Sequence, residues 1–157
     1  MLRYEKRYLV FGSIITFIFG IAIGFFRYKT GTLYLLLGLI VGIFIPKITL
    51  IFMKNIQISK KEFFDFRTFF ITLFLILLFL LGQLFAVSLF ENPIDWLFDI
   101  ISSRKSEAML LFLMDYLPCV SGGLWIFFNL LDLAFMHFML LVFTNVEIEK
   151  LIKKDKK

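Results

Sequence analysis

The apolar run over residues 124–143 constrains this chain more than any other stretch, and Asn129, Asp132 and His137 interrupt it. Twenty residues are enough for one helix to cross a bilayer core of roughly 30 Å. Asp132 falls near the middle of the run, where a carboxylate costs about 3 kcal/mol on insertion scales. We therefore predict a membrane-spanning helix in which other groups offset the cost of a buried carboxylate.

The composition requires lipid as the solvent for most of the chain. Of the 157 residues, 61% are hydrophobic and 23 are Phe, and the mean hydropathy is +0.92. A soluble domain of this size could not bury that much apolar surface. The single cysteine, Cys119, excludes an internal disulfide and is predicted to be a small residue buried in the membrane.

Three further apolar runs are similar in length to the last one. Together they predict spans over residues 8–26, 33–53, 68–90 and 124–143. The sequence contains no soluble domain and no internal repeat. The expected fold class is therefore an all-α integral membrane protein, a four-transmembrane-helix bundle in which residues 1–157 form a single membrane domain.

Residues 93–117, between the third and fourth spans, are predicted to form short helical pieces. Asn92 and Pro93 fit an N-cap followed by proline at the first helical position, and the apolar residues after them share one face, which indicates a short interfacial helix. Residues 108–117 would rise about 15 Å as a helix, which is half the bilayer core. This segment is predicted to be a half-membrane or interfacial helix, or else an extension of the fourth span kinked at Pro118.

The charges in the loops predict the orientation of the spans. Twelve Lys and Arg residues lie in the N-terminal segment, between the second and third spans, and in the basic tail over residues 145–157, whereas the other two loops carry four. The positive-inside rule places the more basic side in the cytoplasm. We therefore expect a multi-pass protein of the cell (inner) membrane with both termini cytoplasmic.

Two pairs of glycines have the spacing that lets helix backbones approach closely. Gly20 and Gly24 lie in the first span, and Gly38 and Gly42 lie in the second. With one span running outward and the next inward, the two pairs come to similar depths. We predict that they pack the first two helices into a tight hairpin, or that one pair packs between protomers of a homo-oligomer.

The polar residues of the predicted spans can also be compared by their depth in the membrane. Gln83 and Asp132 lie about level, Asn129 lies one turn further out, and Lys47 and His137 lie about a turn deeper. We predict an intramembrane polar cluster in which Lys47 reaches toward Asp132, because a paired cation and carboxylate offset each other's desolvation. The alternative is that these side chains only hold helices together, at about 0.6 kcal/mol each. His137 would then be a satisfied interior residue, and Lys47 would extend to the headgroups.

The sequence contains no enzyme signature. H-E-x-x-H, G-x-S-x-G, the P-loop and the dinucleotide-binding glycine pattern are all missing from it. One His and one Cys are too few ligands for a metal site, so no metal or cofactor is predicted. Nucleic-acid binding is not expected either, because no soluble module presents the positive charge.

The basic side of the protein is the remaining functional feature of the sequence. Its lysines either orient the chain and attract anionic lipid, or form a docking face for an acidic cytoplasmic protein. The lysines expected to make such contacts are Lys60, Lys61, Lys150, Lys153 and Lys154.

Three functions fit these observations. The first is a non-enzymatic membrane subunit, an anchor or sensor that oligomerises and recruits a cytoplasmic partner. The second is a homo-oligomeric ion channel or membrane-perturbing pore, by analogy of kind with the membrane subunits of phage-exclusion systems and not by sequence resemblance. The third is a small membrane enzyme that uses Asp132.

Overall fold

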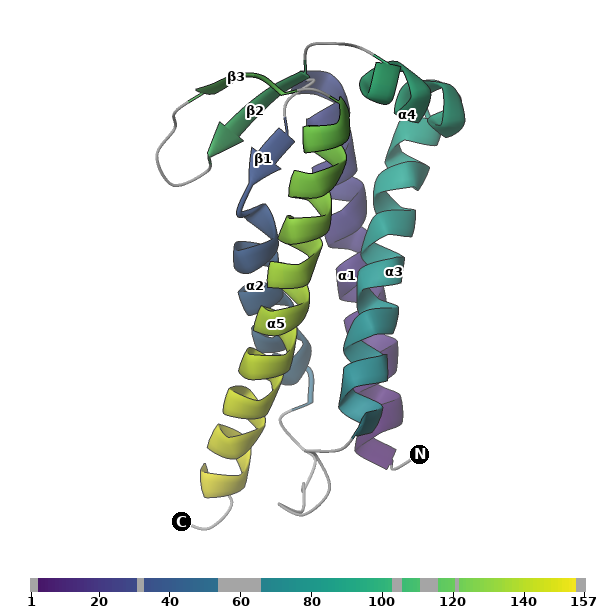
Figure 1. Ribbon diagram of the computed structural model, residues 1–157. Coiled ribbons are helices and arrows are strands. Elements are labelled where there is room, and N and C mark those ends of the chain that lie inside the picture. Colours follow the sequence, from purple (N-terminus) through teal and green to yellow (C-terminus); the bar gives the residue numbers. More distant parts are fainter. Residues whose placement is uncertain are drawn as a thin grey trace.

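The computed structural model describes residues 3–30, 33–53, 66–102, 106–110, 116–120 and 122–154. Within these ranges the chain forms five helices and a small three-stranded sheet (Figure 1). In order they are α1 (Arg3–Thr30), β1 (Leu33–Leu35), α2 (Leu37–Ile51), α3 (Phe66–Ser88), α4 (Pro93–Ser102), β2 (Ser106–Leu110), β3 (Tyr116–Val120) and α5 (Gly122–Lys154). The prediction of a helical fold is confirmed, with the small sheet as an addition to it.

Three of the helices are long and apolar enough to cross a membrane. The apolar stretches are Lys6–Thr30 in α1, Thr68–Ser88 in α3 and Ile126–Ile148 in α5. They overlap the first, third and fourth predicted spans. α2 lies within the second predicted span, but its 15 residues rise only about 22 Å.

The long helices run side by side, with α4 and the sheet at one end of the bundle (Figure 1). α1 begins and α5 ends at the opposite end, on different sides of the bundle. α1 packs along α3, and α2 packs along α5. Fully buried side chains join the two pairs, among them Ile45, Leu75, Met136 and Leu140.

Small residues let α1 and α3 approach closely. A Cβ atom added to Gly24 would lie 2.5 Å from the Cα atom of Gln83 in α3. One added to Gly20 would meet the backbone at Phe79 and Gly82, and Gly82 in turn faces the backbone of α1. The two backbones therefore touch along a line on which no side chain fits.

The glycines of α2 likewise allow its backbone to approach the backbone of α5 closely. A Cβ atom on Gly42 would lie 2.7 Å from the backbone oxygen of Met136, and one on Gly38 would meet the backbone of Asp132. The predicted hairpin of the first two spans is therefore corrected, because the two pairs of glycines do not face each other. Each pair packs instead against a helix that comes later in the chain: the glycines of α1 against α3, and those of α2 against α5.

The segment between α3 and α5 differs in part from the prediction. α4 begins as expected, since the Asn92 Oδ1 atom accepts a hydrogen bond of 3.1 Å from the N–H of Ile94. Residues 108–117, however, do not form a helix in their described part. They contribute to β2 and β3, which pair antiparallel, while β2 also pairs parallel with β1.

The pairing of β1 explains this correction. Leu33 of β1 is opposite Ala108 of β2, 75 residues later in the chain, so a distant segment supplies the hydrogen bonds of the strand. A short apolar run cannot be assigned to helix or strand by its own periodicity. Pro118 also fits a strand here, because β3 is at the edge of the sheet, where proline is tolerated.

Candidate functional site

The side chain of Arg27 is the centre of a polar cluster near the α4 end of the bundle. α1 continues through Arg27 to Thr30, so this residue belongs to the helix and not to a turn. It follows Gly20 and Gly24 on the face that packs against α3, at the spacing i, i+4 and i+7. Only 8% of the residue is exposed.

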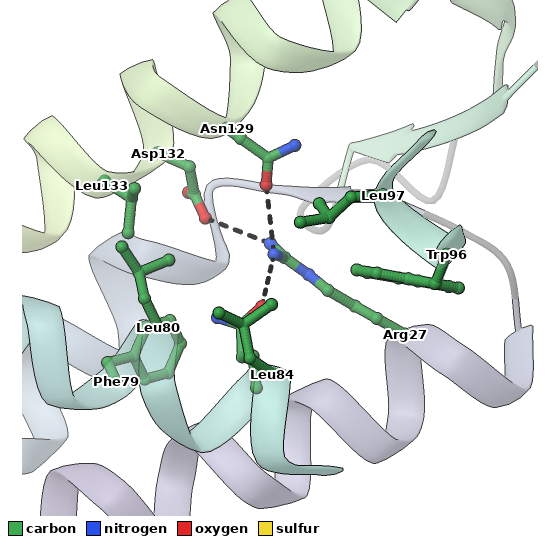
Figure 2. A pocket seen from close by; sticks show the side chains of 10 residues that line it. Arg27, Phe79, Leu80, Leu84, Trp96, Leu97, Asn129, Asp132 and Leu133 are labelled. Carbon is green, nitrogen blue, oxygen red and sulfur yellow. Dashed lines mark hydrogen bonds and ion pairs between the residues drawn. The ribbon is translucent and has the colours of Figure 1, made fainter. Parts of the chain in front are cut away.

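Three side chains from two other helices surround the guanidinium group (Figure 2). Its Nη1 atom donates to Gln83 Oε1 at 2.9 Å and to Asn129 Oδ1 at 3.1 Å. Its Nη2 atom lies 3.7 Å from Asp132 Oδ2. The cluster therefore joins α1, α3 and α5 through one buried cation.

Asp132 has a second partner, the first turn of α2. Its Oδ1 atom accepts a hydrogen bond of 2.9 Å from the N–H of Gly38, the second residue of that helix. The N-cap residue, Leu36, supplies no capping side chain and has a left-handed backbone with φ of 64°. A carboxylate at a helix N-terminus satisfies an unpaired N–H and interacts favourably with the helix dipole. Asp132 thus caps a helix whose own sequence has no cap.

A cavity of about 230 Å³ adjoins the cluster. α3 and α5 form most of its wall, α4 covers one side, and Arg27 of α1 reaches into it (Figure 2). Its lining residues are Arg27, Phe79, Leu80, Gln83, Leu84, Trp96, Leu97, Asn129, Asp132 and Leu133. The lining is mostly apolar, with the polar groups gathered on one side.

The structure brings together three of the five residues expected in the polar cluster. Gln83, Asn129 and Asp132 meet at Arg27, whereas Lys47 and His137 lie elsewhere. Lys47 is exposed, and its Nζ atom lies 5.8 Å from the centroid of the Phe143 ring. The pairing of Lys47 with Asp132 is therefore corrected: Arg27 is the cation beside this carboxylate.

His137 makes a separate contact between α5 and α3. Its Nε2 atom lies 3.0 Å from Thr72 Oγ1, and its ring centroid lies 4.7 Å from that of Phe69. A third polar contact lies near the other end of the bundle, where Tyr8 Oη and Thr144 Oγ1 are 2.7 Å apart. Both contacts join long helices, which is the ordinary use of polar residues between membrane helices.

Sequence reasoning missed Arg27 because a basic residue at the end of an apolar run reads as the start of a loop. The first predicted span ends at residue 26, so Arg27 and Lys29 fall in the loop that follows it. The sequence does contain a signal for Arg27: in a continuous helix, this residue lies on the same face as Gly20 and Gly24 of α1. A cation on a packed face needs an acceptor, and Asp132 was already predicted to need a cation.

Lys150, Lys153 and Lys154 lie in the last turns of α5, and Lys60 and Lys61 lie outside the described residues. Cys119 lies in β3. Among the residues that the structure describes, no group of three or more His, Cys, Asp or Glu side chains could hold a metal ion.

The fold and the site define a class: a small helical protein with three candidate membrane-spanning helices and a buried arginine–carboxylate cluster. Comparison with protein-family models, curated proteins and solved structures found no match.

Proposed function

We propose that this protein is a non-enzymatic membrane subunit of four spans, which acts as an anchor or sensor and recruits a cytoplasmic partner through its basic end. The observation that carries the proposal is the length of α5. Its 33 residues rise about 50 Å without a break, well beyond a bilayer core of roughly 30 Å. Its apolar stretch ends at Ile148, and the helix continues through Lys154.

The continuation of α5 would present basic residues on a rigid support. Lys150, Lys153 and Lys154 lie on it. The exposed Lys6 and Arg7 lie in the first turns of α1, which begins at the same end of the bundle as α5 ends. Positive charge of this kind attracts acidic surfaces and raises the rate of encounter. An acidic protein at the cytoplasmic face is therefore the proposed partner.

The proposal of a fourth span combines α2 with the strand before it. α2 rises about 22 Å, and the three residues of β1 add about 10 Å, so the two together match the bilayer core. Extended backbone at membrane depth is tolerated where protein covers it, and β1 pairs with β2.

A non-enzymatic role is favoured because the oxygen atoms of the polar cluster are already used in contacts between helices. One oxygen of Asp132 binds the N–H of Gly38, and the other lies next to Arg27. Gln83 and Asn129 also use their carbonyl oxygens on Arg27. A general base needs a carboxylate that is available to substrate, and Asp132 is instead used in joining three helices.

We predict that topology reporters fused at either terminus will read cytoplasmic, and that one inserted after Ser102 will read external. The reason is that the N-terminal segment, the segment between the second and third spans and the tail carry twelve Lys and Arg residues in the sequence, against four in the other two loops. The measurement is paired reporter activity, with one reporter active only in the cytoplasm and one active only outside. Termini on opposite sides of the membrane would contradict the four-span proposal.

The partner proposal is tested by charge reversal on the α5 extension. We expect Lys150→Glu with Lys153→Glu and Lys154→Glu to abolish co-purification of the soluble partner, at expression in the membrane matched to the wild type. The triple Lys→Arg variant at the same positions is the control, and it should retain the partner because the charge is kept. Equal recovery of partner with both variants would contradict the proposal. Ion conductance by the purified protein in liposomes would favour the oligomeric pore instead.

A further inference from the structure

Two nitrogen donors of the polar cluster lack an acceptor in the part of the chain that the structure describes. Arg27 Nε and Gln83 Nε2 are both buried and make no hydrogen bond within the described part of the chain. The orientation of the Gln83 amide is set by Arg27, because a guanidinium group only donates and so requires the oxygen of Gln83. Both unsatisfied groups are donors without accessible surface of their own, and both residues line the cavity through other atoms. A ligand in the cavity therefore reaches the two nitrogen atoms through a shift of their side chains. The missing group is therefore a hydrogen-bond acceptor.

The rest of the cavity accepts apolar groups. Leu80 and Leu84 of α3, Leu133 of α5 and Leu97 of α4 line it. Its volume of about 230 Å³ exceeds the roughly 150 Å³ of an engineered apolar cavity that binds benzene. The space is thus large enough for a segment of hydrocarbon chain.

The charge balance of the site selects a neutral acceptor. The cation of Arg27 lies beside the carboxylate of Asp132, so the pair carries no net charge. A carboxylate or phosphate placed against it would itself be a desolvated charge without a counter-ion. An ester carbonyl oxygen accepts hydrogen bonds and adds no charge.

The position of the cavity fits the same chemistry. Arg27 is three residues from the end of α1, and Trp96 of α4 borders the cavity. Tryptophan side chains favour the level of the membrane–water interface. That interface is where the ester groups of membrane lipids lie, next to their acyl chains.

We propose that this cavity is a binding site for a neutral acyl ester. The carbonyl oxygen of the ester would accept hydrogen bonds from Arg27 Nε and Gln83 Nε2, and the acyl chain would lie against the leucines of α3 and α5. A bilayer phospholipid and a free diacylglycerol share this chemistry. The site is at the opposite end of the molecule from the proposed partner surface and does not depend on it.

Quenching of Trp96 fluorescence tests the proposal. The chain has two tryptophans, so the measurement uses the full-length protein in detergent with Trp125→Phe. The probes are brominated diacylglycerol, brominated phosphatidylcholine, the ether-linked analogue of each, which has no carbonyl oxygen, and a brominated fatty acid. We expect saturable quenching by the esters and about tenfold weaker binding of the ethers, the effect of one or two hydrogen bonds.

Two substitutions on neighbouring positions of α3 locate the site. Leu80→Phe fills the cavity and should abolish saturable quenching, whereas Leu81→Phe should not, because Leu81 is 54% exposed and does not line the cavity. Melting curves of both variants show that they fold. The ester–ether comparison needs neither variant, so it decides the proposal even if Leu80→Phe unfolds.

Each outcome has a defined meaning. Tighter binding of phosphatidylcholine identifies a bilayer lipid as the ligand, and tighter binding of diacylglycerol identifies a free neutral lipid; both support the site. Equal quenching by esters and ethers would overturn it, as would equal quenching in Leu80→Phe and the parent. Tighter binding of a brominated fatty acid than of either ester would also overturn it, because the ligand would then be an anion.

Discussion

Replacing Asp132 with alanine is expected to lower the free energy of unfolding by about 3–5 kcal/mol, as is typical when one partner of a buried ion pair is removed. The substitution leaves Arg27 buried without its neighbouring carboxylate and removes the cap from α2. Asp132→Asn should cost less, because an amide oxygen can still accept the N–H of Gly38. Denaturant unfolding in detergent micelles measures both.

A double-mutant cycle identifies the cation that depends on this carboxylate. Arg27→Met with Asp132→Ala should be more stable than Asp132→Ala alone, since no unpaired charge then remains. Lys47→Met is the matched control. Lys47 is exposed and contacts Phe143, so its effect should add to that of Asp132→Ala within about 0.5 kcal/mol. A coupling energy for Lys47 as large as that for Arg27 would contradict the assignment.

Adding one methyl group at Gly38 is expected to separate α2 from α5. The new Cβ atom would meet the backbone of Asp132, which cannot rotate away as a side chain can. Overpacking costs typically 1–3 kcal/mol and occasionally more, and we expect Gly38→Ala to reach the upper end of that range. Gly20→Ala should loosen α1 from α3 for the same reason. The measurement is the melting temperature in detergent.

Gly12 of α1 supplies the control for the glycine experiment. A Cβ atom there would lie 3.4 Å from the methyl groups of Leu75, an ordinary contact. Gly12→Ala should be neutral or stabilising by up to about 1 kcal/mol, because alanine is the better helix former. If Gly12→Ala and Gly38→Ala melted alike, the close backbone approach at Gly38 would have no energetic role.

Much of the helical layout was predictable because each long helix is encoded locally. An uninterrupted apolar run of about 20 residues predicts a helix whatever its neighbours are. Depth along such runs also placed Gln83, Asn129 and Asp132 near one another, since helical rise is regular. The N-cap of α4 could be read from Asn92 and Pro93 for the same local reason.

The parts that were not predictable depend on contacts between distant segments. The glycines of α1 could pack on any other helix, and the sequence does not say that Gly82 of α3 faces them. Residues 106–110 form a strand that pairs with β1, a segment about 75 residues earlier in the chain, and the local sequence does not show this pairing. The choice between Lys47 and Arg27 as the cation depended on which helix faces α5 at that level, and depth alone does not give this.

The cap of α2 also has a consequence for biosynthesis. Asp132 follows Gly38 by 94 residues, and translation at roughly 5–20 residues per second separates the two by on the order of 5–20 s. Throughout that delay the nascent chain holds an arginine without its carboxylate and a short helix without its cap. α1 can pack on α3 much earlier, because both are complete before α5 begins. A chain that stalls before α5 is therefore expected to present both defects together.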